Sequence, residues 1–298
     1  MKRALALCVC VLSACELQEV QIAETEDVLI AEIVLRAGDQ NQHAWLHRTR
    51  AAGQDPRVDD AVVRVESESG TAAQFQRTGE EACLIPRRDT VPAGQGTCYQ
   101  TLDRALEVEP GRTYRLNVTT PDGRRLTGST TVPADFQLLR PARPCHLAAM
   151  GSFEAVWTKS PNAWVYASEI SLWAGQRAFE KHGIKIDSNP LRLFGLSLSA
   201  QDTTIHIAKE FGLFDRFDEH LTEALAFLQQ GVPGPTNLSG VIAAADRNYV
   251  NWERGGGFNP SGFVRVPSVH GDGTGVFGSL VPKDFEVFVD MESHLPLC

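Results

Sequence analysis

Two histidines four residues apart, His43 and His47, are the first candidates for chemistry in this chain. On a helix this spacing places both imidazoles on one face, where they can bind a single metal ion. The flanking residues instead predict a strand, and residues four apart on a strand lie roughly 13 Å from one another. That distance is too long for one shared ion, so we expect structural or solvent-exposed histidines.

Ser197 is a candidate nucleophile because it follows Gly195 by two residues, as the serine of a strand-turn-helix nucleophile elbow does. The second glycine of that motif is absent, and no acidic and histidine partners can be assigned to the serine. A serine without a catalytic role is the better interpretation.

A polar, glycine-rich segment at residues 270–275 contains a carboxylate and an imidazole that a flexible loop would present to a ligand. The segment lacks the length and the acid count of a calcium loop, and a turn between two strands is the alternative. Tryptophans of the second half of the chain offer a binding platform or, alternatively, core packing. A ligand site is therefore predicted along Trp252, Phe258, His270 and Asp272, with no metal and no cofactor.

Cys15 ends a stretch that has the features of an export signal. Lys2 and Arg3 are followed by an apolar run too short to span a bilayer, and small residues precede the cysteine. The order Leu-Ser-Ala-Cys at 12–15 resembles the lipobox of bacterial lipoproteins, whereas an ordinary secretory signal with an unrelated cysteine is the alternative. The resemblance implies a signal peptide at 1–14 and palmitate-type acyl chains on Cys15, which anchor the chain in a lipid bilayer. Glu16 favours the outer membrane of the cell envelope.

The composition excludes some classes of partner. The chain has 37 acidic residues against 28 basic ones, and Lys2 and Arg3 leave with the signal. A body with this excess of negative charge is a poor partner for nucleic acid and for anionic lipid headgroups. Its 43% hydrophobic residues suffice for a sizeable core, and its length favours two domains.

Four cysteines remain after the signal and Cys15 are set aside, and they allow three pairings. An oxidising compartment favours disulfides, and no Cys-x-x-Cys or Cys-His cluster points to a metal. We favour Cys83 with Cys98, which joins two strands across a loop, and Cys145 with Cys298, which joins the start of the second domain to the end of the chain.

The first domain is predicted to be an immunoglobulin-like β-sandwich at 28–136, after a polar tether at 15–27. Short alternating runs separated by turn residues indicate its strands. The clearest hairpin joins 114–119 to 125–132 through Pro121-Asp122-Gly123. Tyr114 lies where such sandwiches have a tyrosine whose hydroxyl is bonded to nearby backbone.

The second domain, at 145–298, is predicted to be β-rich with one or two short amphipathic helices. Strands are expected at 153–157, 164–173, 262–266, 275–280 and 285–289. Apolar residues at helical spacing predict a helix near 215–230. Asp246 is expected to cap a second helix that carries Tyr249 and Trp252 and ends at the glycines 255–257. The overall fold class is therefore mainly β.

Several short motifs together resemble the bacterial lipoprotein family called domain of unknown function 4249. Besides the lipobox, they lie at 110–123, 131–133, 248–252, 266–269 and 273–278. The chain departs from the resemblance at Val269-His270, where an Asn-Ile pair is expected, and along 174–210. The resemblance implies an outer-membrane accessory protein found beside TonB-dependent transporters, and it supplies no catalytic residues.

Three functions follow as expectations. The first is a non-catalytic surface lipoprotein that captures substrate for, or assists, an outer-membrane transporter. The second is a stand-alone carbohydrate- or peptide-binding lipoprotein. The third is a hydrolase, which requires Ser, His and Asp, or two carboxylates, to meet in one pocket.

Overall fold

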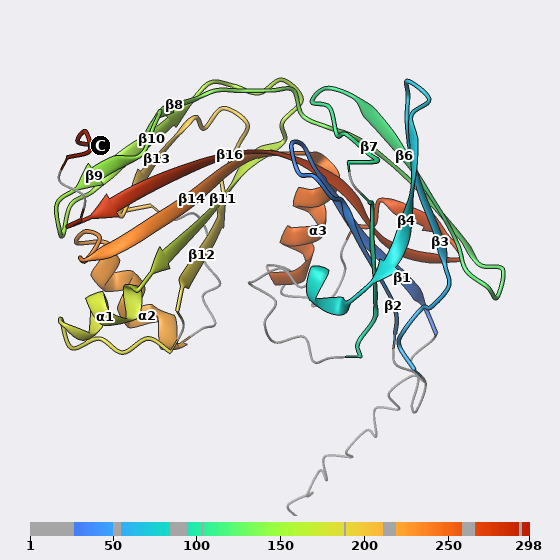
Figure 1. Cartoon of the computed structure of the whole chain (residues 1–298), viewed down its shortest axis with the longest axis horizontal. Helices are drawn as coiled ribbons and strands as arrows, with labels where there is room; N and C mark the ends of the chain where they lie inside the picture. Colours follow the sequence, from blue (N-terminus) through green and yellow to red (C-terminus); the bar gives the residue numbers. More distant parts are fainter. Residues whose placement is uncertain are drawn as a thin grey trace, which may run out of the picture.

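A computed structural model describes residues 27–49, 55–83, 94–102, 104–187, 189–210, 219–257, 266–291 and 294–298. The signal, Cys15 and nearly all of the tether lie outside these residues. The chain is mainly β, as predicted, and its strands form one long curved sheet with a smaller sheet packed over one end (Figure 1). Among the described residues, no helix is long and apolar enough to cross a membrane.

The N-terminal part of the chain is the predicted immunoglobulin-like sandwich. One layer has the order β1-β2-β5-β4 and the other has the order β3-β6-β7, with β4 paired to both β5 and β3. Lettered from A to G along the chain, these are the A-B-E-D and C-F-G orders of an immunoglobulin domain. The strands are β1 (Leu29–Arg36), β2 (His43–Arg48), β3 (Val62–Ser67), β4 (Ala72–Thr78), β5 (Thr97–Gln100), β6 (Thr113–Thr119) and β7 (Arg125–Thr131).

Alternating side chains hold the two layers together. In β1 every second residue, beginning at Leu29, is buried, and in β6 Tyr114, Leu116 and Val118 are buried. The predicted hairpin is confirmed, since β6 and β7 pair in register and Gly123 adopts the positive φ of the turn. The Tyr114 hydroxyl donates to the Glu107 carbonyl at 3.1 Å and accepts from the Glu109 amide at 2.8 Å. The predicted tyrosine corner is therefore present.

A single 17-residue strand, β16 (Gly273–Val289), replaces the two strands predicted at 275–280 and 285–289. Its first half pairs in parallel with β1, and its second half pairs antiparallel with β14 (Thr236–Ala245). Pro282 lies opposite Ala243 of β14, after β1 has ended at the level of Leu280 and before β9 begins. The strand continues through this proline because a missing amide proton is tolerated where one side has no neighbouring strand.

The strand β16 also changes the expected division of the chain. Residues from 269 onward are predicted to belong to the second domain. Yet β15 (Val269–Gly271) pairs with β7, and the start of β16 pairs with β1 of the sandwich. The predicted strand at 262–266 lies almost wholly outside the described residues. One strand thus belongs to both parts of the molecule and joins them into a continuous arch (Figure 1).

The C-terminal part is β-rich, with helices near both predicted positions and another at 175–180 that was not predicted. The strands β10 and β11, predicted on either side of the turn at 160–162, are present but lie in different sheets. The rings of Phe179 and Phe227 bring α1 and α2 into edge-to-face contact. The elements are β8 (Leu138–Arg140), β9 (Cys145–Leu147), β10 (Phe153–Trp157), β11 (Val165–Trp173), α1 (Gly175–Glu180), β12 (Leu191–Leu196), β13 (Thr204–Ile207) and α2 (Glu219–Leu228).

Two disulfides have the favoured pairing. Cys83, which follows the short 3₁₀ helix η1 (Glu80–Ala82), is bonded to Cys98 in β5. Cys145 of β9 is bonded to Cys298 at the end of the chain. The helix α3 (Arg247–Gly257) is the one predicted after Asp246, and it lies under the arch against β16 (Figure 1).

Candidate functional site

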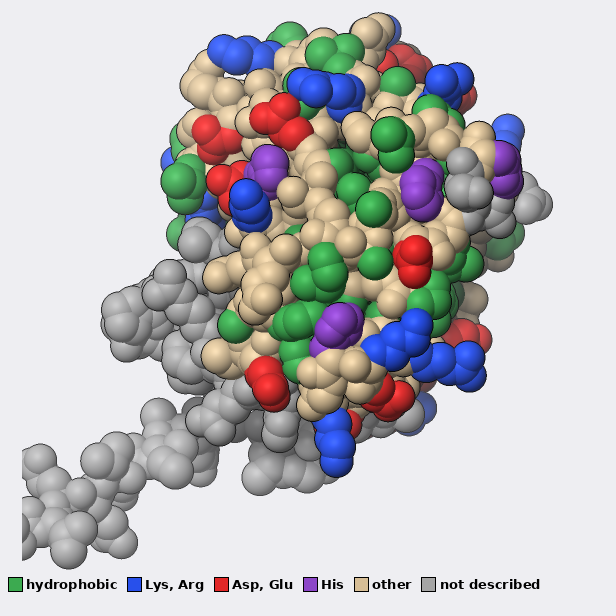
Figure 2. Space-filling model, turned by 90° about the vertical axis from the view of Figure 1, so that its left-hand side faces the viewer, with side chains coloured by type: hydrophobic (Ala, Val, Ile, Leu, Met, Phe, Trp, Pro, Cys, Tyr) green, Lys and Arg blue, Asp and Glu red, His purple; other side chains and the backbone are tan. Residues whose placement is uncertain are grey.

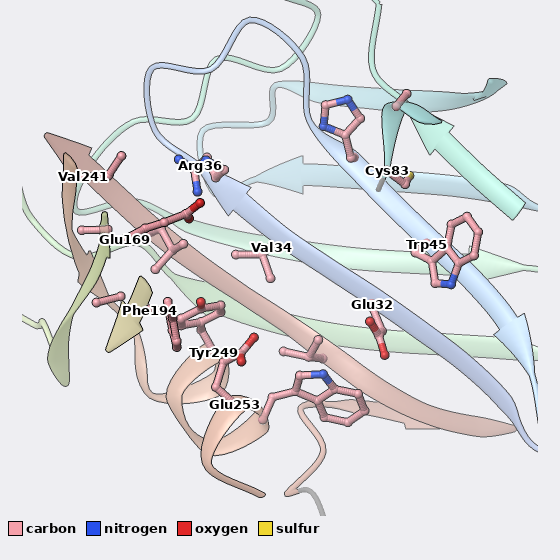
Figure 3. A pocket seen from close by; sticks show the side chains of 17 residues that line it. Glu32, Val34, Arg36, Trp45, Cys83, Glu169, Phe194, Val241, Tyr249 and Glu253 are labelled. Carbon is pink, nitrogen blue, oxygen red and sulfur yellow. The ribbon is translucent and has the colours of Figure 1, made fainter. Parts of the chain in front are cut away.

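A cavity of about 380 Å³ lies on the concave side of the arch, between α3 and the strands of the long sheet (Figure 3). It is large enough for a small ligand, at the lower end of the range for binding pockets. Its wall combines aromatic, aliphatic and charged side chains. The lining residues are Glu32, Val34, Arg36, His43, Trp45, Ala82, Cys83, Ala167, Glu169, Phe194, Val241, Ala243, Tyr249, Trp252, Glu253, Val276 and Leu280.

The alternation of β1 and β2 places several of these side chains in the cavity. While the odd-numbered residues of β1 enter the core, Glu32, Val34 and Arg36 face the other side of the sheet. Trp45 lies directly opposite Glu32 on β2, and Val276 lies opposite Glu32 on β16. Residues opposed in this way have Cβ atoms about 5 Å apart. A carboxylate is therefore flanked by an indole and an aliphatic side chain on one face.

The disulfide Cys83–Cys98 forms part of the same wall. Cys98 lies opposite Trp45 in the β2–β5 pair, and its partner Cys83 lines the cavity. Gly96 gives the Trp45 ring its position, since an added Cβ there would lie 2.6 Å from the indole. The η1 segment is therefore held against the sheet beside the tryptophan.

Helix α3 forms the opposite wall and is fixed at its first turn. Asp246 accepts the Tyr249 amide at 2.9 Å, as an N-cap residue does, and it also accepts the Ser279 amide and the Thr130 hydroxyl. The Asn248 side chain donates to the carbonyls of Ser129 and Phe277, both at 2.9 Å. Burial raises the pKa of Asp246, and its hydrogen bonds oppose that shift.

Close packing continues along the helix. Gly278 of β16 lies under Tyr249, and a Cβ at this position would lie 2.9 Å from the Tyr249 backbone nitrogen. Tyr249 and Val250 belong to a small apolar cluster with residues of β11, β12, β14 and β16. This contact directs Trp252 and Glu253 toward the cavity.

The charges around the cavity are partly paired. Arg36 donates from Nε to Asp39 at 3.0 Å, and Figure 3 shows the Glu169 carboxylate directed toward Arg36. Glu32 Oε1 lies 3.7 Å from His47 Nε2, with the Glu32 side chain only 13% exposed. Burial lowers the pKa of His43, and the nearby Asp39 opposes the shift.

Of the described residues predicted to bind a ligand, one lies at the cavity. Trp252 lines the cavity, whereas Phe258 lies outside the described residues. His270 and Asp272 are not among the lining residues. His270 belongs to strand β15 at the edge of the sandwich, and Asp272 lies between β15 and β16, where its carboxylate accepts the Arg125 amide at 2.8 Å. This carboxylate fixes a turn between strands, and the combined ligand site stays a prediction.

Most of the other candidate residues are in structural positions. His43 and His47 lie on strand β2, as expected, and His43 also lines the cavity. Ser197 accepts the Tyr166 amide and donates to the Ser199 carbonyl. Trp157 is buried and contacts Tyr166 edge to face. Within the described ranges, no group of three or more His, Cys, Asp or Glu side chains is placed to hold a metal ion.

Most of the lining residues were missed by the sequence analysis. Glu32 and Trp45 occupy outward positions of amphipathic strands, which the alternation marks as solvent-facing. A usable signal is the density of large side chains at these outward positions, since Trp45 has no reason to face water.

One end of the molecule gives a contrasting surface. Figure 2 shows the left-hand side of the view in Figure 1, where side chains of both charges are interspersed around scattered hydrophobic ones. A mixed surface of this kind offers no continuous basic stripe on that face for a polyanion.

Comparisons with known proteins identify the family of this chain from its sequence and not from its structure. A search of curated proteins gave no match. Among solved structures, fibronectin(III)-like modules of Clostridium thermocellum CbhA align at 10% identity, covering 89% of this chain and 94% of that chain, with a TM-score of 0.20. The IG1 and IG2 domains of DIP-gamma align at 8% identity, covering 90% and 100%, also with a TM-score of 0.20.

The sequence matches the family described as domain of unknown function (DUF4249) over residues 16–174. The motifs at 110–123 and 131–133 lie within this range, and those at 248–252, 266–269 and 273–278 lie beyond it. Since the match covers more than half of its residues, the chain belongs to the DUF4249 family.

Proposed function

We propose that this protein is a non-catalytic lipoprotein of the cell envelope that captures a small ligand in the cavity beneath the arch. Cys15 carries the acyl chains and holds the protein at the outer membrane. A TonB-dependent transporter is the proposed partner that receives the ligand. The observation that carries the proposal is the cavity itself, with Trp45 and Trp252 in its wall.

The length of the tether is consistent with an anchored body. Eleven residues lie between Cys15 and Asp27, so the two are separated by at most roughly 40 Å. Asp27 is bound by the guanidinium groups of Arg48 and Arg124, and its carbonyl accepts from Arg124 at 2.9 Å. The sandwich would therefore stay close to the membrane, with the start of β1 fixed by ion pairs.

A stand-alone carbohydrate- or peptide-binding lipoprotein is the second candidate. Aromatic side chains beside carboxylates suit sugar rings and peptides alike, and the cavity offers both. This candidate shares the capture step with the first and differs only in the absence of a transporter.

The experiment is a crosslinking pull-down of the affinity-tagged protein from its native envelope. Cys15→Ala supplies the unanchored control, and Trp45→Ala supplies an anchored form with an altered cavity. Recovery of a transporter with the anchored forms alone would support the accessory function. Fractionation of the anchored protein with the outer membrane without any protein partner would favour the stand-alone candidate. An unaltered membrane fraction for Cys15→Ala would contradict the anchor.

A further inference from the structure

We propose that a gap in the long sheet, beside residues 281–286 of β16, binds a short extended segment of another protein in which basic and apolar residues alternate. The segment adds a strand to β16 between β1 and β9. Residues 281–286 are not among those that line the cavity, so the inference goes beyond the proposed capture and does not depend on it.

The gap follows from the pairing of β16. One edge of this strand pairs with β14 along the whole range 280–289. The other edge pairs with β1 as far as Leu280 and with β9 from Val287 onward (Figure 1). No described strand pairs with residues 281–286 on this second edge. The gap from Leu280 to Val287 is roughly 23 Å long at about 3.3 Å per residue, which is enough for a short extended segment.

The hydrogen bonds at the two ends of the gap show which residues of β16 face this edge. The Leu280 carbonyl accepts the Ala37 amide at 2.9 Å, just after β1 ends. The Asp290 amide donates to the Leu147 carbonyl at 2.8 Å, at the end of β9. The amide and the carbonyl of one residue face the same edge, and successive residues of a strand alternate between edges. The even-numbered residues between 280 and 290 therefore direct their backbone groups toward this edge.

Four backbone groups consequently point into the gap. They are the Pro282 carbonyl, the Asp284 amide and carbonyl, and the Glu286 amide. None of them has a hydrogen-bond partner among the described residues. A row of unpaired donors and acceptors at a sheet edge is what an added strand binds. A partner segment of about three extended residues can bond all of these groups.

A groove with a volume of about 640 Å³ lies beside this part of β16. Its other walls are formed by residues 135–138 and by the segment 141–144, which leads into β9. Pro141 and Pro144 have no amide proton to donate, so this segment is poorly suited to complete the sheet. The groove therefore leaves room for a chain from another molecule.

The concave face of the gap favours basic side chains. Asp284 lies opposite Val241, a residue that lines the cavity, so Asp284 and Glu286 are on the concave face. Both side chains are exposed, and neither has an ion pair among the described residues. Arg143, which also lines the groove, leaves both carboxylates unpaired. Basic residues opposite the two carboxylates would form favourable cross-strand pairs.

The other face of the gap favours apolar side chains. Lys283 lies on this face, where its ammonium group is 2.8 Å from Asp135 and stands over the Phe136 ring. Phe285, two residues on, contacts the Phe153 ring edge to face. The one cation on this part of β16 is therefore already paired, and its surroundings are aromatic. Residues of the partner that face this side should be apolar.

Charge disfavours two other occupants of the gap. A second copy of the chain would place Asp284 and Glu286 against the same carboxylates, and like charges on opposed strands repel. The tether of this chain, at 16–26, contains four acidic residues and no basic residue. A basic segment of a different protein is therefore the favoured occupant.

The test is residue-resolved hydrogen exchange, followed by NMR on the full chain carrying Cys15→Ala. The probe is the blocked peptide acetyl-Lys-Val-Lys-Val-Lys-amide. The Asp284 and Glu286 amides should exchange rapidly in the free protein, and about 1 mM peptide should slow both about tenfold, because only the complex protects them. The counterpart with glutamate in place of lysine should protect them less, and salt should weaken the effect of the lysine peptide.

Two methylated peptides test the backbone hydrogen bonds. One carries N-methyl groups on its lysines and the other on its valines, with the side chains unchanged. In an added strand one set of amides faces β16 and the other faces away, so only one of the two peptides should lose its effect. The same effect of both methylated peptides would overturn the inference, because binding would then not use one edge of the segment.

Variants test the charge. Asp284→Asn and Glu286→Gln should each weaken binding of the lysine peptide about threefold. Glu180→Gln, on the exposed surface of α1, is the control and should leave binding unchanged. Thermal unfolding checks the fold of each variant, and the methylated peptides test the same site in the unaltered chain.

Three results would overturn the inference. The first is slow exchange of both amides in the free protein, and the second is no protection by the lysine peptide. The third is protection that grows with protein concentration when no peptide is present, which would identify a second copy as the occupant. None of these results involves the cavity, whose capture function is tested separately by the pull-down.

Discussion

Trp45 and Glu32 show how one strand pair contributes both to the core and to the cavity. Their neighbours in sequence, Ala44 and Ile33, are fully buried in the sandwich core, while they themselves line the cavity. A strand that is apolar on one face and functional on the other provides a rigid base for a site. The packing of the core therefore fixes the geometry of the cavity.

Tyr114 provides a test of the sandwich at the residue scale. We expect Tyr114→Phe to lower the free energy of unfolding by about 1 kcal/mol, because it removes a buried hydroxyl that bonds the Glu107 carbonyl and the Glu109 amide. Urea unfolding measures the change. Tyr99→Phe, which removes similar bonds to Val58 and Ala61, should give a comparable loss. An unchanged midpoint for Tyr114→Phe would contradict this role of the tyrosine corner.

The ion pairs at the start of β1 predict a dependence of stability on pH. The Thr120 hydroxyl bonds Asp122, and with help from Arg48 it lowers the pKa of that carboxyl to about 2. A carboxyl with a lowered pKa stabilises the folded state above about pH 4, and that stabilisation is lost as the pH falls toward 2. Because the Asp122 side chain is 40% exposed, the effect should be about 1 kcal/mol or less.

Asp122→Asn isolates this contribution. We expect the variant to lose less stability than the wild type between pH 4 and pH 2.5, when the free energy of unfolding is measured in urea at each pH. Equal losses in the two proteins would show that other carboxyls account for the acid sensitivity.

At the element scale, local sequence patterns predicted some helices and strands, and pairing between distant segments determined others. The hairpin of β6 and β7 and the helix that begins after Asp246 follow from turn and cap residues alone. The continuity of β16 does not, because Pro282-Lys283-Asp284 has the composition of a turn. The segment becomes a strand through pairing with β14, which is distant in sequence.

The candidate site follows the same division. Trp252 was predicted because aromatic residues on a short helix stand out in the sequence. Glu32 and Glu169 were not, because they line one cavity only when the curved sheet brings β1 and β11 around α3. The curvature of a sheet cannot be predicted from a short-range sequence pattern.

The contact between α3 and β16 is testable at Gly278. Gly278→Ala should lower the free energy of unfolding by about 1–3 kcal/mol, because the new methyl group meets the backbone of Tyr249, which cannot move aside as a flexible side chain can. Urea unfolding measures this change. Glu286→Ala, at an exposed position of the same strand, serves as the control and should have little effect. A neutral Gly278→Ala would mean that α3 is not held at this distance.

At the scale of the whole molecule, the two disulfides constrain very different lengths of chain. Cys83 and Cys98 are 15 residues apart, whereas Cys145 and Cys298 are 153 apart. In the chain-entropy model the shorter loop contributes about 3 kcal/mol and the longer one about 5 kcal/mol. The longer connection spans the entire C-terminal part, including β14, α3 and β16.

The two bonds should therefore have opposite rankings for stability and for the exposure of Trp45. Replacing Cys145 and Cys298 by serine should cost more free energy of unfolding than replacing Cys83 and Cys98, as measured by urea unfolding. The exposure of Trp45, measured by iodide quenching of its fluorescence, should respond in the reverse order, because Cys83 lines the cavity and its bond holds η1 beside Trp45, while neither Cys145 nor Cys298 is among the lining residues. If both pairs changed the quenching in proportion to stability, the cavity would depend on global folding alone, and the wall formed by η1 would have no separate role.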